Sequence, residues 1–266
     1  MQMTRFELSL GLFFIYFIIY FLFIKIIILY IQTKKIKNYL MFWECMSIFE
    51  KWAWIKRNWS YIIEEASKLD LVFVGGTVLN LIIFYEYRAS EDIDLYDPFS
   101  KPIGSNHEKE CLIQLAKILR NKGFEIKFPN KRELLIGPNI KIDVFNDGTP
   151  FKKIKKIQHE QIEVRTFDIK TTIEMKTNAL LCRSIYDPRD LVDLFVLTKE
   201  SNNDLSFPTR ECDVINSKYS ERLNDIVSTR KEDLYYFQTM QQVNNLPFDE
   251  FEKFKRESYE WLSGFC

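Results

Sequence analysis

Histidine is scarce in this chain of 266 residues, which contains only His107 and His159. Because the two are far apart in the sequence, they offer no zinc site, and no Ser-His-Asp arrangement can be recognised. Cysteine is also sparse, and no Cys-x-x-Cys spacing occurs among Cys45, Cys111, Cys182, Cys212 and Cys266. Isolated cysteines of this kind are typical of reduced cytosolic thiols rather than of a disulfide-stabilised secreted protein.

The chain also lacks an excess of charge of either sign, since 37 Lys and Arg residues balance 37 Asp and Glu residues. A protein that binds nucleic acid through a globally basic surface is therefore not supported. The one dense basic run is Lys-Lys-Ile-Lys-Lys at residues 152–156. It could contact an RNA backbone. More often, such a run is a solvated edge strand whose lysines oppose aggregation.

Long apolar runs are missing except at residues 8–31, which are almost entirely Leu, Ile, Phe and Tyr, interrupted by Lys25. The run is long enough to cross a bilayer as a helix. It has no small-residue cleavage site, so it is not typical of a removed signal peptide. Lysines at 34, 35 and 37 follow it, and the positive-inside rule then places the rest of the chain in the cytoplasm.

We therefore predict an N-terminal apolar helix within residues 1–45 that anchors the protein to a membrane through residues 8–31. The alternative is that translation starts at Met41 or Met46, which leaves a cytoplasmic protein without this segment.

The most informative stretch starts where an apolar strand meets a glycine pair. Residues 71–74, Leu-Val-Phe-Val, predict a buried strand. Gly75 and Gly76 follow, and without a Cβ they allow a sharp turn and a close approach to a ligand. Thr77 is then the expected N-cap of a largely buried helix that continues to about residue 87. Free N–H groups at this turn could bind phosphate.

Two carboxylates appear soon after the predicted helix. In the sequence Asp92-Ile93-Asp94-Leu95, the aspartates share one face of a strand, directed toward the glycine turn. Residues 140–145 alternate in the same way and place Asp143 on a polar face. If the two strands are neighbours, three carboxylates converge, and they could hold two Mg²⁺ ions about 4 Å apart on a nucleoside triphosphate.

The second half of the chain adds cations. Lys176 and Arg183 are seven residues apart and are expected on one helical face, where they could neutralise a triphosphate or a departing pyrophosphate. Pro188 suits the first turn of the next helix. On that helix Asp190 and Asp193 share a face and could orient either cation. Without further information, solvated helices joined by weak salt bridges explain this pattern better.

Together these motifs resemble the polymerase-β-like nucleotidyltransferase superfamily, and within it the AbiEii/AbiGii-type toxin family. That family carries Gly-Gly-Thr-Ala-Leu and Arg-x-Ser-x-Asp-Ile-Asp-Leu, which correspond here to residues 75–79, with Val78 in place of Ala, and to Arg88–Leu95. Its later lysine helix and Arg-Asp-x-x-Asp-Leu motif correspond to residues 174–180 and to Arg189–Leu194. The likeness covers about residues 70 to 200.

The resemblance implies an α/β (α+β) nucleotidyltransferase fold with a mixed sheet, followed by a helical C-terminal lobe. We expect an N-terminal segment at 1–45, a nucleotidyltransferase core at 46–168 and the helical lobe at 169–266. Within the core we expect helices over about 47–68 and 107–122. Further strands are expected near 124–128, 132–136, 140–145 and 161–167.

The implied reaction transfers a nucleoside monophosphate from an NTP to an acceptor hydroxyl, with tRNA as the expected acceptor and a cognate antitoxin as partner. The implied catalytic residues are Asp92, Asp94, Asp143, Lys176 and Asp190, of which the first three bind Mg²⁺. The implied nucleotide-binding residues are Gly75, Gly76, Thr77, Arg88, Ser90 and Arg183. Two alternatives stay open: an enzyme with a small-molecule or protein acceptor, and a non-catalytic nucleotide-binding module at the membrane.

Overall fold

The computed structural model describes residues 48–84, 86–100, 105–130, 133–147, 152–183, 187–203, 219–229 and 248–264. The predicted apolar segment 8–31, and the whole of residues 1–45, lie outside this part of the chain. Within the part described, no helix combines the length and the apolar character needed to cross a membrane. Residues Ile48–Cys266 belong to one compact unit.

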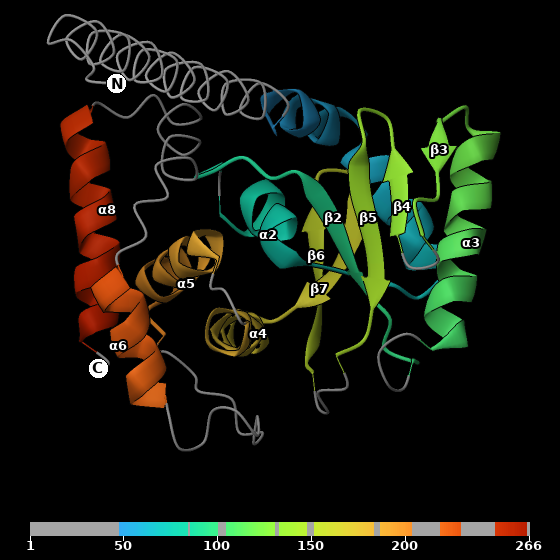
Figure 1. Ribbon diagram of the computed structural model, residues 1–266. Coiled ribbons are helices and arrows are strands. Elements are labelled where there is room, and N and C mark those ends of the chain that lie inside the picture. The colour runs from blue at the N-terminus through green and yellow to red at the C-terminus, as the bar shows by residue number, and fades with distance from the viewer. Residues whose placement is uncertain are drawn as a thin grey trace, which may run out of the picture. The chain divides into compact units, whose positions relative to one another are not determined.

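Five strands form a mixed sheet in the order β1-β2-β5-β4-β3. Figure 1 shows β2, β5, β4 and β3 of this sheet. The strands are β1 (Val72–Val74), β2 (Asp92–Tyr96), β3 (Ile126–Lys127), β4 (Glu133–Ile136) and β5 (Ile140–Phe145). β2 and β5 are parallel, and all other neighbours are antiparallel. The predicted mixed sheet of an α/β protein is thereby confirmed.

A separate two-stranded hairpin is formed by β6 (Ile154–His159) and β7 (Ile162–Phe167). Much of the basic run 152–156 lies on β6, which pairs only with β7 among the described strands. Its lysines at 155 and 156 are exposed. These exposed lysines agree with the interpretation of the run as a solvated edge strand. Lys152 does not, because its side chain is buried, pairs with Asp147 and lies over the Tyr96 ring.

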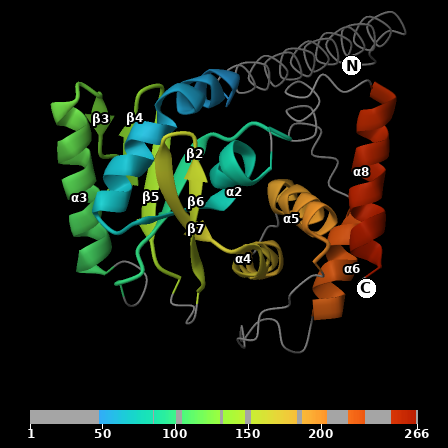
Figure 2. The same ribbon diagram turned by 180° about the vertical axis from the view of Figure 1, so that it is seen from behind.

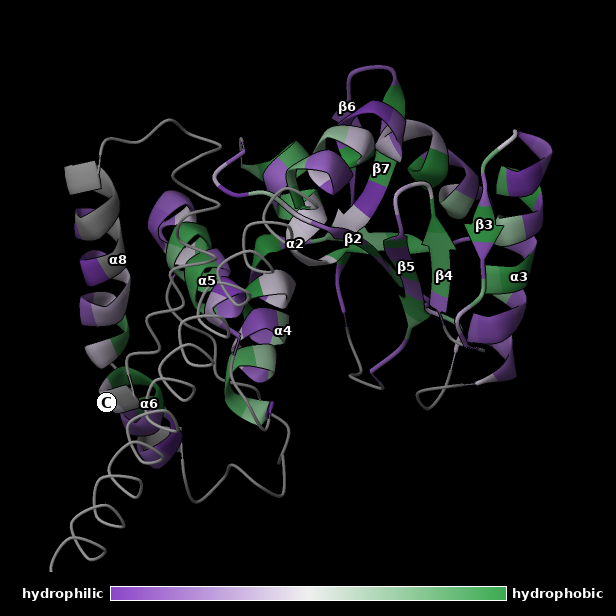
Figure 3. Ribbon diagram, turned by 45° about the horizontal axis from the view of Figure 1, so that its top comes forward, coloured by the Kyte–Doolittle hydropathy of each residue, from purple (hydrophilic) through white to green (hydrophobic). Residues whose placement is uncertain are grey.

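Two helices cover one face of the sheet. They are the helix of residues 48–68 and α3 (Asn106–Asn121), which Figure 2 shows from behind. Inward-facing residues of the strands, such as Ile93, Leu95 and Ile142, pack with both helices in one hydrophobic core. In Figure 3, α3 shows hydrophilic and hydrophobic segments in alternation, as an amphipathic helix does. The opposite face of β2 and β5 carries polar residues at the start of the strands, whereas Tyr96 and Phe145 at their ends belong to a third, small hydrophobic cluster.

The chain after β7 is helical in its described parts, as predicted. α4 (Ile169–Cys182) and α5 (Pro188–Ser201) are followed by α6 (Tyr219–Thr229) and α8 (Phe248–Ser263). Asp168 and Asp187 cap α4 and α5 with their side chains, and Pro188 occupies the first turn of α5. Leucines of all four helices share a second hydrophobic core.

The segment after the glycine pair differs from the prediction. α2 covers only Gly75–Val78, a π-helix η1 (Leu79–Ile83) follows, and the chain is extended at Phe84. The side chain of Asn80 donates to the Gly76 carbonyl and accepts the Arg88 N–H, which turns the chain back early. The expectation that Thr77 is an N-cap was wrong, because Thr77 lies inside α2 and Val74 precedes the helix.

Candidate active site

The three predicted carboxylates lie on the face of the sheet opposite the hydrophobic core. Asp92 and Asp94 alternate with the buried Ile93 and Leu95 on β2. Asp94 stands in register with Asp143 on the parallel neighbour β5. All three side chains are partly exposed. The sheet therefore brings residues 92, 94 and 143 to one accessible face, although about 50 residues separate the two strands.

The glycine turn is built tightly against one of these carboxylates. Gly75 has φ +82°, in the left-handed region that favours glycine, and a Cβ there would lie 2.2 Å from Asp94 Oδ2. Val74, the residue before it, pairs with Asp94 across β1 and β2. Gly75 therefore leaves room for the Asp94 carboxylate, and the backbone of the turn borders the carboxylate face.

The second glycine makes room for an arginine. A Cβ at Gly76 would lie 2.0 Å from Nη2 of Arg88. The two glycines thus serve two different side chains, a carboxylate on the sheet and a buried guanidinium.

The local field around Asp94 is unfavourable to its charge. Burial and the neighbouring Asp92 carboxylate raise the pKa of Asp94 to about 7, against the lowering effect of the Lys176 ammonium. Burial also raises the pKa of Asp143, and the adjacent Lys141 opposes this shift. Because ionisation of these carboxyl groups is unfavourable here, a cation that binds to them stabilises their charged form.

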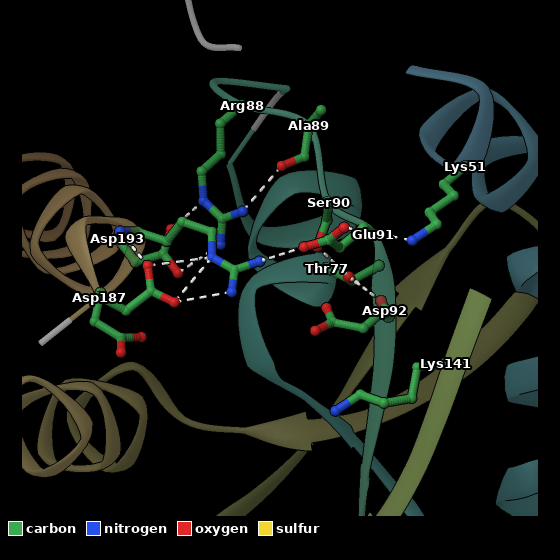
Figure 4. A network of polar contacts seen from close by, with 12 residues as sticks. Lys51, Thr77, Arg88, Ala89, Ser90, Glu91, Asp92, Lys141, Asp187 and Asp193 are labelled. Atoms are coloured by element: carbon green, nitrogen blue, oxygen red, sulfur yellow. Dashed lines mark hydrogen bonds and ion pairs between the residues drawn. The ribbon is translucent and has the colours of Figure 1, made fainter. Parts of the chain in front are cut away.

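Lys141 supplies one such cation and was not predicted from the sequence. Its Nζ lies 2.6 Å from Asp143 Oδ2, and its Cα stands opposite Asp92 in the sheet register. Figure 4 shows Lys141 and Asp92 next to each other. The i, i+2 spacing of Lys141 and Asp143 on a strand is the sequence signal that would have placed them on one face.

The donor set fits hard divalent cations, because all three side chains offer carboxylate oxygens. Their donor atoms do not all lie within 4.8 Å of one another. Asp143 is paired with Lys141 in this structure and must leave it to join a metal site.

Thr77 and Ser90 link the glycine turn to the carboxylate strand. Both are buried, and Thr77 Oγ1 lies 2.6 Å from Ser90 Oγ. Thr77 also donates to the main-chain carbonyl of Asp92 (Figure 4). These side chains hold the start of β2 against α2. Their contact with phosphate stays a prediction.

Arg88 occupies a buried ion network that joins the two halves of the chain. Its guanidinium makes a bidentate pair with Asp193 of α5, with distances of 2.7 and 2.8 Å (Figure 4). Asp193 is fully buried and also accepts from the Tyr87 hydroxyl at 2.7 Å. In this structure the polar atoms of Arg88 are directed to Asp193 and to the Ala89 carbonyl.

Lys176 is part of the same network. Its ammonium lies 2.8 Å from Asp190 and 2.7 Å from Asp193, so these two residues of α5 orient it, as their spacing predicts. Burial alone would lower the pKa of Lys176, but the two carboxylates hold it above its ordinary value. Burial would raise the pKa of Asp193, but Arg88 and Lys176 hold it well below. Lys176 is thereby kept cationic beside Asp94.

Arg183 reaches this network from outside the helix. α4 ends at Cys182 and Arg183 has extended backbone angles, so the expectation that it shares a helical face with Lys176 was wrong. Its Nη1 nevertheless lies 2.7 Å from Asp190 Oδ2, and its side chain is half exposed. Arg183 is therefore the accessible cation of this group.

A further set of ion pairs was not predicted. Arg189 contacts Glu91 at 2.9 Å and Asp187 at 2.8 Å, and Lys51 contacts Glu91 at 3.5 Å. These residues connect α5 and the helix of residues 48–68 to the loop before β2. Arg189 begins the Arg-Asp-x-x-Asp-Leu motif, but no local pattern in the sequence indicates its partner Glu91, 98 residues away.

The mixed sheet and the glycine turn packed against the aspartates of β2 are the features that the resemblance to nucleotidyltransferases implies. A family model described as "Nucleotidyl transferase AbiEii toxin, Type IV TA system" matches residues 60–260. Because the match covers most of the chain, the protein belongs to the AbiEii nucleotidyltransferase toxin family and is a nucleotidyltransferase. A comparison with curated proteins gave no match.

Two solved structures are distantly similar. An antigenic nucleotidyltransferase-like protein from Paracoccidioides brasiliensis shares 14% identity at a TM-score of 0.44, over 71% of this chain and 92% of that one. The Megavirus polyadenylate synthase shares 16% identity at a TM-score of 0.38, over 82% of this chain and 50% of that one. The assignment to the family rests on the family model and not on these two structures.

Proposed function

We propose that the protein is a Mg²⁺-dependent enzyme that transfers a nucleoside monophosphate from an NTP to a hydroxyl of tRNA, as the toxin of a type IV toxin–antitoxin system. The observation that supports this most is the register of Asp94 and Asp143 on parallel strands, with Gly75 packed against Asp94. The family supplies the expectation of a toxin with a cognate antitoxin.

In this proposal Asp92, Asp94 and Asp143 hold the metal ions. Bound Mg²⁺ would polarise the triphosphate and favour deprotonation of the acceptor hydroxyl. The hydroxyl oxygen forms a bond to the α-phosphorus while the bond to the leaving pyrophosphate oxygen breaks, in line. Asp143 is proposed either to accept the hydroxyl proton or to complete the metal site, in which case the proton leaves to solvent.

The cations of the second half are proposed to serve the leaving group. The Lys176 ammonium lowers the pKa of Asp94, so the positive charge of Lys176 acts on the carboxylate face. Arg183 is accessible and held by Asp190 near Lys176. Both could stabilise the negative charge that develops on pyrophosphate. The N–H groups of Gly75, Gly76 and Thr77 are proposed to bind phosphate oxygens.

Arg88 is proposed to act as a positioning residue. It fixes Asp193, and Asp193 fixes Lys176. This role explains why Arg88, the arginine of the Arg-x-Ser-x-Asp-Ile-Asp-Leu motif, is buried.

The test is a labelling reaction with residues 46–266, Mg²⁺, total tRNA and each of the four α-³²P-labelled NTPs. Label on tRNA is expected with the wild-type chain and should be lost in Asp92→Asn/Asp94→Asn. The matched control is Asp225→Asn, which alters an exposed carboxylate on α6. Label that persists in the double variant would refute the assigned site. A wild-type chain that binds NTP but leaves tRNA unlabelled would refute the tRNA acceptor.

We also propose that residues 8–31 anchor this cytoplasmic enzyme to the membrane, on the strength of their sequence alone. The full chain should sediment with membranes and resist alkaline carbonate, whereas residues 46–266 should not. Mass spectrometry of the native protein that finds Met41 or Met46 as its first residue would refute the anchor.

A further inference from the structure

A second group of ligand-type side chains lies on the other face of the sheet. Among the described residues, Asp97, His107 and Cys111 have one potential donor atom each within 4.8 Å of the others. Asp97 directly follows β2, and His107 and Cys111 are four residues apart on α3. Asp97 continues the alternation of Ile93 and Leu95, so it belongs to the face that α3 covers, opposite Asp92 and Asp94.

The group is built before any ligand arrives. Asp97 Oδ1 accepts the N–H groups of Phe99 and Ser100, which leaves Oδ2 directed at His107 Nδ1, 2.5 Å away. The Asp97 main chain is fixed by Phe145 and by the side chain of Asn146. Cys111 Sγ lies 3.7 Å from the same histidine nitrogen. A carboxylate oxygen, an imidazole nitrogen and a sulfur therefore lie close together.

The geometry points to a site for a borderline-soft divalent cation, and we propose that Asp97, His107 and Cys111 bind Zn²⁺. Tetrahedral zinc with bonds of about 2.0–2.3 Å separates its N, O and S ligands by roughly 3.3–3.6 Å. The separation between Nδ1 and Sγ already has about this value. The separation between Nδ1 and Oδ2 must widen by roughly 0.8 Å to reach it. The His107 side chain can move by this amount, because 46% of it is exposed.

The chemistry of the three groups agrees with this assignment. Zinc with three protein ligands keeps a fourth position for water, and the exposed side of His107 provides it. The thiol proton of Cys111 must leave to solvent as the S–Zn bond forms. The bound ion would clamp the end of β2 to the first turns of α3.

Sequence reasoning had excluded zinc because the two histidines are far apart. The site needs only one of them. The His-x₃-Cys spacing of residues 107 and 111 was visible in the sequence, but the position of Asp97 depends on how β2 ends beside α3.

The test uses Co²⁺ as a spectroscopic substitute for Zn²⁺ on the chelator-treated full chain. Wild-type protein should show a thiolate-to-cobalt charge-transfer band that saturates at one ion per chain and disappears when Zn²⁺ is added. Cys111→Ser should abolish the band, whereas Cys182→Ser, which alters an exposed thiol, should keep it. Asp92→Asn should also keep it, which separates this site from the carboxylates on the opposite face.

His107→Gln provides a second test if Cys111→Ser does not fold, because the His107 side chain is half exposed. It should weaken Co²⁺ binding at least tenfold and remove the rise in melting temperature that Zn²⁺ produces in the wild type. A wild-type chain without the band would overturn the proposal. So would a band that survives in Cys111→Ser, or an unchanged Co²⁺ affinity in His107→Gln.

Discussion

The buried network around Asp193 gives the sharpest prediction about stability. Asp193→Ala removes the shared partner of Arg88 and Lys176 and leaves two buried cations, each with fewer partners. Breaking a buried ion pair from one side costs about 3–5 kcal/mol. For a folded unit of this size, that loss corresponds to a fall in melting temperature of about 10 °C.

The measurement is urea and thermal unfolding of residues 46–266, followed by circular dichroism. Asp225→Ala is the control, because its pair with Arg222 is exposed and should contribute at most about 1 kcal/mol. The pKa of Asp193 is depressed in the folded state, so its stabilising contribution is complete above about pH 4. It is lost as the pH falls through the folded pKa. A change below about 1 kcal/mol for Asp193→Ala at pH 7 would refute the assigned role of the network.

Three further predictions concern the carboxylate face. Gly75→Ala should reduce nucleotidyl transfer by about two orders of magnitude or more, because a Cβ would displace Asp94; kcat values near wild type would contradict the packing. Lys141→Met frees Asp143 and should tighten Mg²⁺ binding, measured by calorimetry; weaker binding would show that Lys141 assists the metal site. With chelator present, the free energy of unfolding should decrease as the pH rises from about 4 to about 7, because the pKa of Asp94 is raised in the folded state. Asp94→Asn should reduce this decrease. The same pH dependence of unfolding in Asp94→Asn and in the wild type would exclude Asp94 as its cause.

The carboxylate face could be predicted because strand alternation is a local property. Asp92, Asp94 and Asp143 each alternate with buried aliphatic residues, so their common face follows from the sequence once β2 and β5 are neighbours. The helix of residues 48–68 and α3 also lie close to the bounds expected for them, about 47–68 and 107–122. The mixed sheet was implied by the family resemblance.

The partners of the charged residues could not be predicted, because they depend on tertiary contacts. Arg88 and Asp193 are 105 positions apart, and no period in the sequence links them. The early end of η1 depends on the Asn80 side chain, which bonds to both Gly76 and Arg88. The apolar pattern indicated a longer helix there, but β-branched and aromatic residues have a low helix propensity.

These buried contacts explain how the two halves of the chain make one site. A buried ion pair is weak evidence for added stability, since apolar residues of similar size often stabilise as well or better. The network does fix the positions of these side chains, because Asp193 pairs with Arg88 and with Lys176 of α4 at the same time. Lys176 is thereby held where its charge acts on Asp94. Arg88 therefore acts on the carboxylate face indirectly, because through Asp193 it positions the Lys176 ammonium near Asp94.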